Sequence, residues 1–141
     1  MTYLEPTMDA GRAFATSGRT GPVAMLNLLR FRAVADYSAT PQLTPARPIT
    51  GAAAFDRYIE HTLPFLRASV GSIRFLGRGG GWLIGPADER WDLAMMIEQA
   101  SVESFLAFAS NAAYLAGIGH RTAAIEDSRL LPLTEIARTA G

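Results

Sequence analysis

Four residues of this chain stand out because their side chains suit proton transfer or the holding of a substrate oxygen. Asn27 interrupts the apolar run PVAMLNLLRF, Asp92 lies in RWDLAMMIEQ, and His120 and Arg121 stand together in GIGHRT. A buried amide can orient a carbonyl or enolate oxygen, and a guanidinium can hold a carboxylate or phenolate. An imidazole, or a carboxyl whose pKa burial has raised, can act as a general base. Asn27, Asp92, His120 and Arg121 are therefore the candidate catalytic residues.

Each of these residues also has an ordinary structural interpretation. The amide of a buried Asn27 can simply satisfy neighbouring backbone groups. Asp92 can pair with Arg30 or Arg121 and stay ionised, and this pairing is the favoured interpretation because arginines are plentiful. His120 can be a surface or capping histidine. Arg30, at the end of the Asn27 strand, is assigned to an ion pair, whereas both interpretations stay open for Arg121.

Aromatic residues at regular spacing are candidates for lining a pocket. Tyr58, Trp91 and Tyr114 could contact a flat ligand, and they are the candidate substrate-binding residues. The same residues would equally suit a plain hydrophobic core. Tyr58 belongs to an apolar stripe at helical spacing in GAAAFDRYIEHTLPFLRAS. That stripe consists of Phe55, Tyr58, Ile59, Thr62 and Leu66.

The composition excludes several kinds of chemistry. The 141 residues include no cysteine, and all 13 basic residues are arginine. Disulfides, thiolate nucleophiles, cysteine-ligated zinc and iron–sulfur clusters are therefore excluded, and so are lysine Schiff bases and P-loops. The two histidines lack the spacing of a zinc motif. We expect no metal and no cofactor, although haem ligation by His120 stays open without specific support.

Charge and hydropathy also limit the partners. The formal net charge is zero, with 13 basic and 13 acidic residues, so the main driving force for nucleic-acid binding is missing. No apolar run reaches the length of a membrane span, and the N-terminus carries acids without the apolar core of a secretory signal. We expect a soluble, cytoplasmic protein that binds neither nucleic acid nor membrane.

The pattern of predicted elements indicates an α+β domain. It comprises a helix (6–16), a strand (22–31), a Pro-rich loop (33–50), a helix (51–69), strand signals SIRFLGR and GWLIG, a strand (91–99), helical segments capped by Ser101 and Asn111 that reach 127, and a strand (128–133) before a fraying tail, TEIARTAG. This order predicts a ferredoxin-like, split βαβ subunit whose antiparallel sheet has helices on one face. We expect a single domain over 1–141, with an N-terminal helical extension (1–20) and a loop insertion (33–50).

The strand 22–31 has two apolar faces. Val23, Met25, Asn27 and Leu29 share one face, and Ala24, Leu26, Leu28 and Arg30 share the other. A strand of this kind is normally covered on both sides. Because the predicted helices cover only one side, we expect a second copy of the chain to cover the other, in a two-fold homodimer.

Three segments, in this order, resemble a known family. They are VAMLNLLRFR, FDRYIEHTLPFLRASVGSIRFLGRG and RWDLAMMIEQASVESFLAFASNAAYLAGIGHRTAAIEDSRLLPL. The family is domain-of-unknown-function family thirteen-thirty, an uncharacterised family of the dimeric α/β-barrel superfamily related to antibiotic-biosynthesis-monooxygenase-like proteins. The resemblance implies a ferredoxin-like subunit whose sheet pairs with that of a second subunit to form a barrel. It implies no particular reaction, because the activity of the family itself is unassigned. Related branches resemble cofactor-free monooxygenases, haem-degrading enzymes, muconolactone-isomerase-like proteins and small structural or sensing modules.

The residues and the resemblance lead to two hypotheses of different classes. In the first, a metal-independent enzyme holds a small hydrophobic oxygenated compound, such as a quinol or a lactone, between its sheet and its helices. Asn27 and Arg121 would polarise an oxygen and His120 or Asp92 would move a proton, in an oxygenation or an isomerisation. In the second, the same cavity serves a non-catalytic ligand-binding or interaction module. Whether the four residues converge on one cavity distinguishes the two hypotheses.

Overall fold

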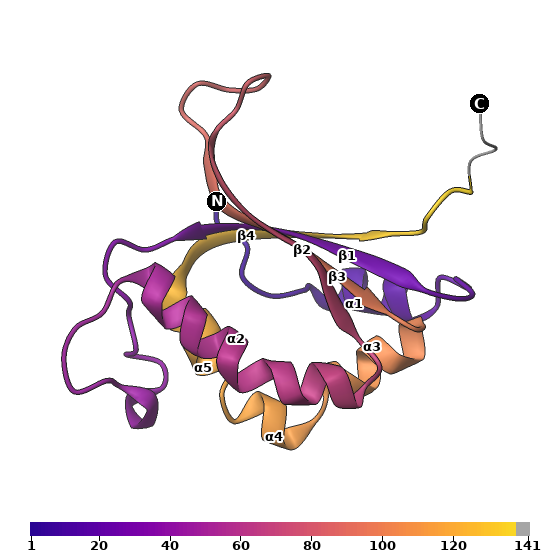
Figure 1. The fold of residues 1–141 in the computed structure, drawn as a ribbon, viewed down its shortest axis with the longest axis horizontal. Helices are drawn as coiled ribbons and strands as arrows, with labels where there is room; N and C mark the ends of the chain where they lie inside the picture. Colours follow the sequence, from indigo (N-terminus) through magenta and orange to yellow (C-terminus); the bar gives the residue numbers. More distant parts are fainter. Residues whose placement is uncertain (138–141) are drawn as a thin grey trace.

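The computed structural model describes residues 1–137, which form one sheet with helices packed against it (Figure 1). In chain order the elements are α1 (Met8–Ala15), β1 (Val23–Phe31), the 3-10 helix η1 (Pro41–Leu43), α2 (Gly51–Ala68), β2 (Ser72–Gly81), β3 (Arg90–Gln99), α3 (Val102–Ala109), α4 (Ala112–Leu115), α5 (Gly119–Ala124) and β4 (Ile125–Leu133). The strand order in the sheet is β2-β3-β1-β4, and every neighbouring pair is antiparallel. Helix α2 connects β1 to β2, and α3–α5 connect β3 to β4, which is the split βαβ arrangement. The predicted ferredoxin-like α+β fold is confirmed.

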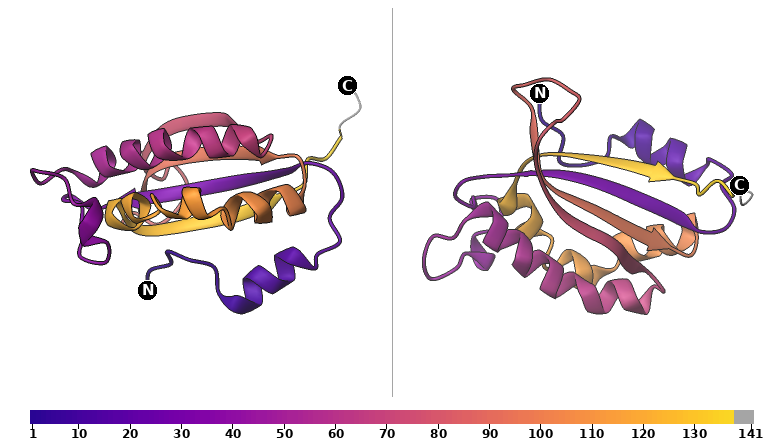
Figure 2. Two further views of the ribbon diagram at one scale, coloured as in Figure 1. Left: turned by 90° about the horizontal axis from the view of Figure 1, so that it is seen from below. Right: turned by 45° about the horizontal axis from the view of Figure 1, so that its top comes forward.

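The two faces of the sheet differ in what covers them. Helices α2 to α5 lie on one side of the sheet, as the view from below shows (Figure 2, left). On β1, Val23, Met25, Asn27 and Leu29 are buried on that side, while the residues between them are only partly buried. The predicted division of this strand into two faces is therefore confirmed. We call the side away from the helices the outer face; it carries Leu26, Leu28, Phe75, Met96 and Leu131.

Polar caps begin four of the helices. Thr7, Thr50 and Ser101 each accept a hydrogen bond of 3.0 Å from the backbone N–H three residues further on, at the starts of α1, α2 and α3. The side chain of Asn111 accepts two such bonds, of 2.9 and 3.1 Å, at the start of α4. These bonds satisfy N–H groups that a helix leaves without partners. The caps predicted at Ser101 and Asn111 are confirmed.

Close backbone packing fixes the start of α2. The N–H of Gly51 donates to the carbonyl oxygen of Arg32 at 3.0 Å, and the N–H of Arg32 donates to that of Ala124 at 2.9 Å. A Cβ atom at position 51 would overlap both carbonyl oxygens, so only glycine fits there. The ends of β1 and α5 thus hold α2 in place, and Phe55, the largest fully buried side chain, lies on its inner side.

Two boundaries differ from the sequence predictions. GWLIG does not form a second strand: β2 runs without a break to Gly81, and residues 82–89 form the connection to β3. Leu83 and Ile84 in this connection are 100% and 90% exposed, so their hydropathy reflects no burial within the chain. The predicted helix up to 127 is also wrong at its end, because β4 begins at Ile125, which pairs with Phe31 across a shift in register.

Within residues 1–137, no helix is long and apolar enough to cross a membrane. Residues 134–137 of the tail TEIARTAG have no regular secondary structure. The remainder of the predicted fraying, at 138–141, lies outside the described residues.

Candidate functional site

A cavity of about 800 Å³ lies between the inner face of the sheet and the helices. Most of its lining is apolar. The sheet contributes Met25, Asn27, Ile73, Met95, Ile97, Gln99, Ser128, Arg129, Leu130 and Pro132; the helical segments contribute Tyr58, Ile59, Thr62, Leu63, Leu66, Phe105, Leu106, Phe108, Ala109, Tyr114, Ile118 and Arg121; and the N-terminal segment contributes eight residues between Tyr3 and Phe14. This volume is typical of sites that enclose a small organic molecule.

Asn27 lies on the floor of the cavity, in the middle of β1. It pairs across the sheet with Met95 on one side and Leu130 on the other, and all three residues line the cavity. One amide N–H donates to the carbonyl oxygen of Met25 at 3.1 Å. Among residues 1–137 the amide makes no further hydrogen bond through its side chain, so one N–H and the carbonyl oxygen remain available to a ligand.

Thr62 brings a second buried polar group to the cavity from the opposite side. Its residue is 8% exposed, and its Oγ1 has no hydrogen-bond partner within the described part of the chain. It lies one helical turn after Tyr58 on α2, so the two side chains share the face that covers the sheet. A buried hydroxyl without a partner costs about 1–3 kcal/mol.

Tyr58 and Tyr114 form a buried pair of phenols at the cavity wall. Their hydroxyl oxygens are 2.6 Å apart, which joins α2 to α4. Burial raises the pKa of Tyr114 far above its ordinary value, and the neighbouring Tyr58 raises it further. Tyr114 is therefore protonated at neutral pH and can act as a hydrogen-bond donor.

Arg121 supplies a positive charge to the same cavity. The half-buried guanidinium donates from Nη1 to the carbonyl oxygen of Leu4 at 2.8 Å. No carboxylate oxygen within residues 1–137 lies within 4.0 Å of it, so the ion pair with Asp92 considered from the sequence is not formed.

The N-terminal segment, residues 3–14, forms one wall of the cavity. At its start, the backbone of Tyr3 accepts hydrogen bonds from the N–H and the hydroxyl of Ser128, at 3.0 and 2.5 Å. At its end, the ring of Phe14 on α1 packs edge to face on Phe105 of α3, with ring centres 5.5 Å apart. No residue of α1 is buried, so the segment is held mainly at its two ends.

Three of the residues predicted for this site do not line the cavity. The carboxylate of Asp92 accepts a hydrogen bond from the N–H of Phe31 at 2.8 Å and pairs with Arg90 at 3.4 Å. It therefore joins the ends of β1 and β3. The ring of Trp91 lies against the guanidinium groups of Arg30 and Arg129, at 5.5 and 5.0 Å. We therefore leave Asp92 and Trp91 out of the candidate site.

His120 faces away from the cavity lining. Its Nδ1 is 2.8 Å from the hydroxyl of Tyr37, a buried residue of the 33–50 loop. Burial lowers the pKa of His120, and the charges of Arg57 and His61 lower it further. The structure thus couples this histidine to the loop and does not bring it beside Asn27.

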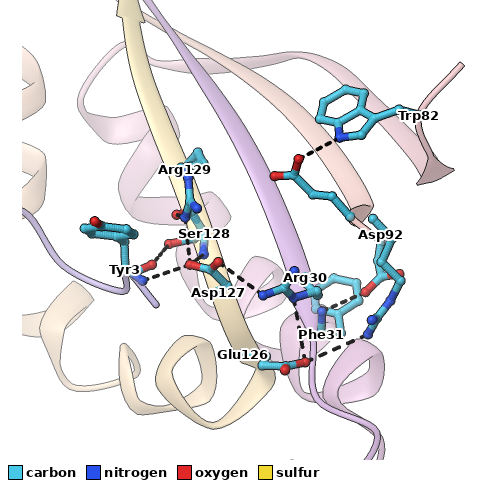
Figure 3. A network of polar contacts seen from close by, with 11 residues as sticks. Tyr3, Arg30, Phe31, Trp82, Asp92, Glu126, Asp127, Ser128 and Arg129 are labelled. Carbon is cyan, nitrogen blue, oxygen red and sulfur yellow. Dashed lines mark hydrogen bonds and ion pairs between the residues drawn. The ribbon is translucent and has the colours of Figure 1, made fainter. Parts of the chain in front are cut away.

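A cluster of charged groups lies at the end of β1 and β4 (Figure 3). Asp127, whose side chain is 3% exposed, is 3.2 Å from Arg30 and 2.7 Å from Arg129. Its Oδ1 also accepts the N–H of Tyr3 at 2.8 Å. Burial raises the pKa of Asp127, but these hydrogen bonds and the charge of Arg129 outweigh it and hold the pKa below its ordinary value. The ion pair predicted for Arg30 is present, and it includes a longer contact of 3.8 Å to Glu126.

The sequence did not indicate every residue that lines the cavity. Thr62 belongs to the apolar stripe of α2, and a threonine within such a stripe indicates a buried hydroxyl. No pattern indicated that the N-terminal segment forms a wall.

The polar and charged side chains that line the cavity limit its chemistry. Its polar side chains are two arginines together with amides and hydroxyls, which both donate and accept hydrogen bonds, and the carboxylate among its lining residues is the exposed Glu5. Within residues 1–137 no group of three histidine, aspartate or glutamate side chains is placed to hold a metal ion. The arrangement can bind and polarise an oxygen of an apolar compound, whereas a buried general base is missing from this lining.

Comparisons with known proteins identify close relatives among solved structures. No family model matches this chain, and no curated protein matches it either. The RPA0582 protein of Rhodopseudomonas palustris, a protein of unknown function, is 33% identical, with a TM-score of 0.87 over 98% of this chain and 100% of that chain. Methylated RPA0582 protein is 35% identical, with a TM-score of 0.86 over 97% and 98% of the two chains. A dimeric protein of unknown function with a ferredoxin-like fold from Bacteroides fragilis is 13% identical, with a TM-score of 0.48 over 79% of this chain and 94% of that chain.

Proposed function

The chain belongs to the family of the RPA0582 protein of Rhodopseudomonas palustris, whose function is unknown, and on this premise we propose a function from the cavity itself. The protein binds a small, largely apolar compound that carries at least one oxygen, with Asn27, Thr62 and Arg121 contacting the polar part. One observation supports this proposal above the others. Two buried polar groups, on Asn27 and Thr62, face a mostly apolar cavity of about 800 Å³ with hydrogen-bonding capacity that the described residues do not use.

A tryptophan that fills the cavity tests this function. Ala109 lines the cavity from α3, and Ala107, on the same helix, is exposed and does not line it. Small apolar alcohols, ketones, lactones and acids are screened by thermal unfolding against the wild type, Ala109→Trp and the matched control Ala107→Trp. At about 100 times Kd a ligand should stabilise the wild type by about 2.7 kcal/mol. Stabilisation should be lost in Ala109→Trp and kept in Ala107→Trp; equal stabilisation of both variants, or no stabilising compound, contradicts the proposal.

Asn27→Ala adds a second readout, because it removes a polar group without filling the cavity. We expect this variant to bind oxygenated compounds less tightly and a hydrocarbon of the same size equally well. A uniform loss for both kinds of compound would indicate a collapsed site and not a lost contact.

An enzyme is the second candidate, and the Tyr58–Tyr114 pair favours it. The hydroxyl oxygens of these two buried phenols are 2.6 Å apart. They can donate to an oxygen that gains negative charge, as in the isomerisation of an unsaturated lactone through an enolate. The proton would then have to be moved by Glu5, because neither Asp92 nor His120 lines the cavity. Turnover of such lactones, lost in both Tyr114→Phe and Glu5→Gln and kept in Tyr37→Phe, would establish this function. If the wild type turns over none of these lactones, the enzyme is ruled out and only the binding function remains.

Membership of the dimeric α/β-barrel superfamily, near domain-of-unknown-function family thirteen-thirty, would place a second copy of the chain on the outer face. The support is its apolar character: Phe75 and Leu131 are 61% and 54% exposed in the single chain, beside Leu26, Leu28 and Met96. Sedimentation at micromolar concentration should give a dimer for the wild type and a monomer for Leu28→Glu. A monomeric wild type would contradict this assignment.

A further inference from the structure

We propose that the ligand of this cavity is a small organic monoanion, with a carboxylate or phenolate at one end of an apolar body, and that Arg121 binds the anionic group. The inference rests on the proposed function and adds to it the charge of the ligand. Volume and apolar lining alone would suit a neutral compound equally well, so the inference depends on the charged and donor groups of the wall.

The two arginines of the cavity wall differ in whether an acid neutralises them. Arg129 is 2.7 Å from the buried carboxylate of Asp127. Arg121 has no carboxylate oxygen within 4.0 Å in residues 1–137, and its side chain makes one hydrogen bond, to the carbonyl of Leu4. A guanidinium has five N–H donors, so most of those on Arg121 remain available. A half-buried cation beside apolar side chains lacks compensation, which an anion in the cavity would supply.

The neighbours of Arg121 are donors as well. One of the hydroxyls of Tyr58 and Tyr114 donates to the other at 2.6 Å, which leaves the proton of the accepting hydroxyl free to donate. The charge of Arg121 acts on Tyr114, so the two groups lie in one electrostatic environment. The positive charge of Arg121 beside such a donor favours a ligand oxygen that only accepts, as in a carboxylate or phenolate.

The charge balance of the wall limits the ligand to a single negative charge. Arg121 offers one uncompensated positive charge, and the exposed carboxylate of Glu5 also lines the cavity, where it would repel a second anionic group. The remaining surface is formed by side chains such as Met25, Leu66 and Phe108. A phosphate dianion or a dicarboxylate would therefore leave a charge in apolar surroundings, at a high cost in desolvation.

Matched acids and alcohols test this inference by calorimetry at neutral pH. The probes are decanoate with decanol, and phenylbutyrate with phenylbutanol, which separate an aliphatic body from an aromatic one. Each is titrated into the wild type, Arg121→Gln, Arg121→Lys and Arg57→Gln. Arg57 is an exposed arginine of α2 that does not line the cavity, so Arg57→Gln controls for the loss of one positive charge.

The expected result is a loss that depends on the charge of the ligand. In Arg121→Gln the affinity for at least one acid should fall by about tenfold or more, because hydrogen bonds to charged groups are this strong, while the affinity for its alcohol stays within about twofold. Arg121→Lys should retain part of the affinity for the acid, and Arg57→Gln should retain all of it. Arg121→Lys also shows whether the loss reflects charge or the missing contact to Leu4.

Two other results have different meanings. Equal losses for acid and alcohol in Arg121→Gln, or alcohols that bind while both acids do not, would overturn the anionic ligand and leave the proposed function standing. If none of the four probes binds the wild type and the screen with Ala109→Trp also finds no ligand, the proposed function fails and this inference fails with it.

Discussion

Two groups of buried polar side chains in this molecule differ in how many partners their members have. At the end of β1 and β4, Asp127 contacts two arginines and the backbone of Tyr3, so its charge is fully compensated. In the cavity, the Thr62 hydroxyl has no partner among the described residues and Arg121 has no acid. Folding alone explains the first group. The second group has a cost for folding that a ligand would offset, and this difference separates a structural cluster from a candidate binding site.

Removal of the central acid of the charged cluster should have the largest effect on stability. Asp127→Asn leaves Arg30 partly buried without a full partner and weakens the attachment of Tyr3. We expect the free energy of unfolding to fall by about 3 kcal/mol, as for other broken buried ion pairs, measured by urea denaturation.

The exposed pair of Arg74 and Glu98, at 3.4 Å, provides the control. Glu98→Gln should change the free energy of unfolding by less than about 1 kcal/mol. A cost of Asp127→Asn as small as this would mean that the charged cluster is not structural, and the contrast with the cavity would disappear.

Thr62→Val should have a smaller effect of the opposite sign. Valine has nearly the same shape and removes a buried hydroxyl without a partner, so we expect the free energy of unfolding to rise by about 1 kcal/mol. The control Thr50→Val removes the cap of α2, so it should lower the free energy of unfolding by about 1 kcal/mol. If urea denaturation shows that both substitutions destabilise the protein equally, the Thr62 hydroxyl has a structural partner and the argument for the cavity weakens.

His120 should give the smallest effect, as a dependence of stability on pH. Its pKa in the folded state lies below the ordinary value of 6.5, so the unfolded chain binds the proton more readily. The free energy of unfolding should therefore fall as the pH drops below 6.5, towards the folded-state pKa.

The check on His120 is a comparison of slopes between about pH 8 and 5. His120→Gln should show a flatter dependence of the free energy of unfolding on pH than the wild type. Equal slopes would mean that the contact with Tyr37 does not disfavour the protonated imidazole.

The sequence predicted the fold, and four of the seven residues that it proposed for the site line the cavity. Alternation along β1 separates Asn27 from Arg30 on opposite faces, and the helices cover the face with Asn27. The same alternation argues against Asp92 once the register is known. Asn27 pairs with Met95, and residues an odd number of positions from Met95 point to the other face.

The remaining residues could not be placed from local patterns. His120 and Arg121 are adjacent on the short helix α5, where successive side chains point in directions about 100° apart, and of the two only Arg121 lines the cavity. The wall formed by residues 3–14 depends on contacts with Ser128 and Phe105, which are more than 90 positions away in the chain. Contacts over this separation leave no periodic signal in the sequence.

Methionine methyl groups allow the most direct test of a ligand site in the cavity. The chain has five methionines; Met25 and Met95 line the cavity, and Met96 lies on the outer face of the same strand as Met95. With methyl-labelled methionine, the binding of decanoate or decanol is followed by NMR, through shift changes and contacts between ligand and methyl protons. We predict changes and contacts at Met25 and Met95 and none at Met96. Contacts at Met96 in place of Met25 and Met95, or no response at any of the three, would contradict a ligand site in the cavity.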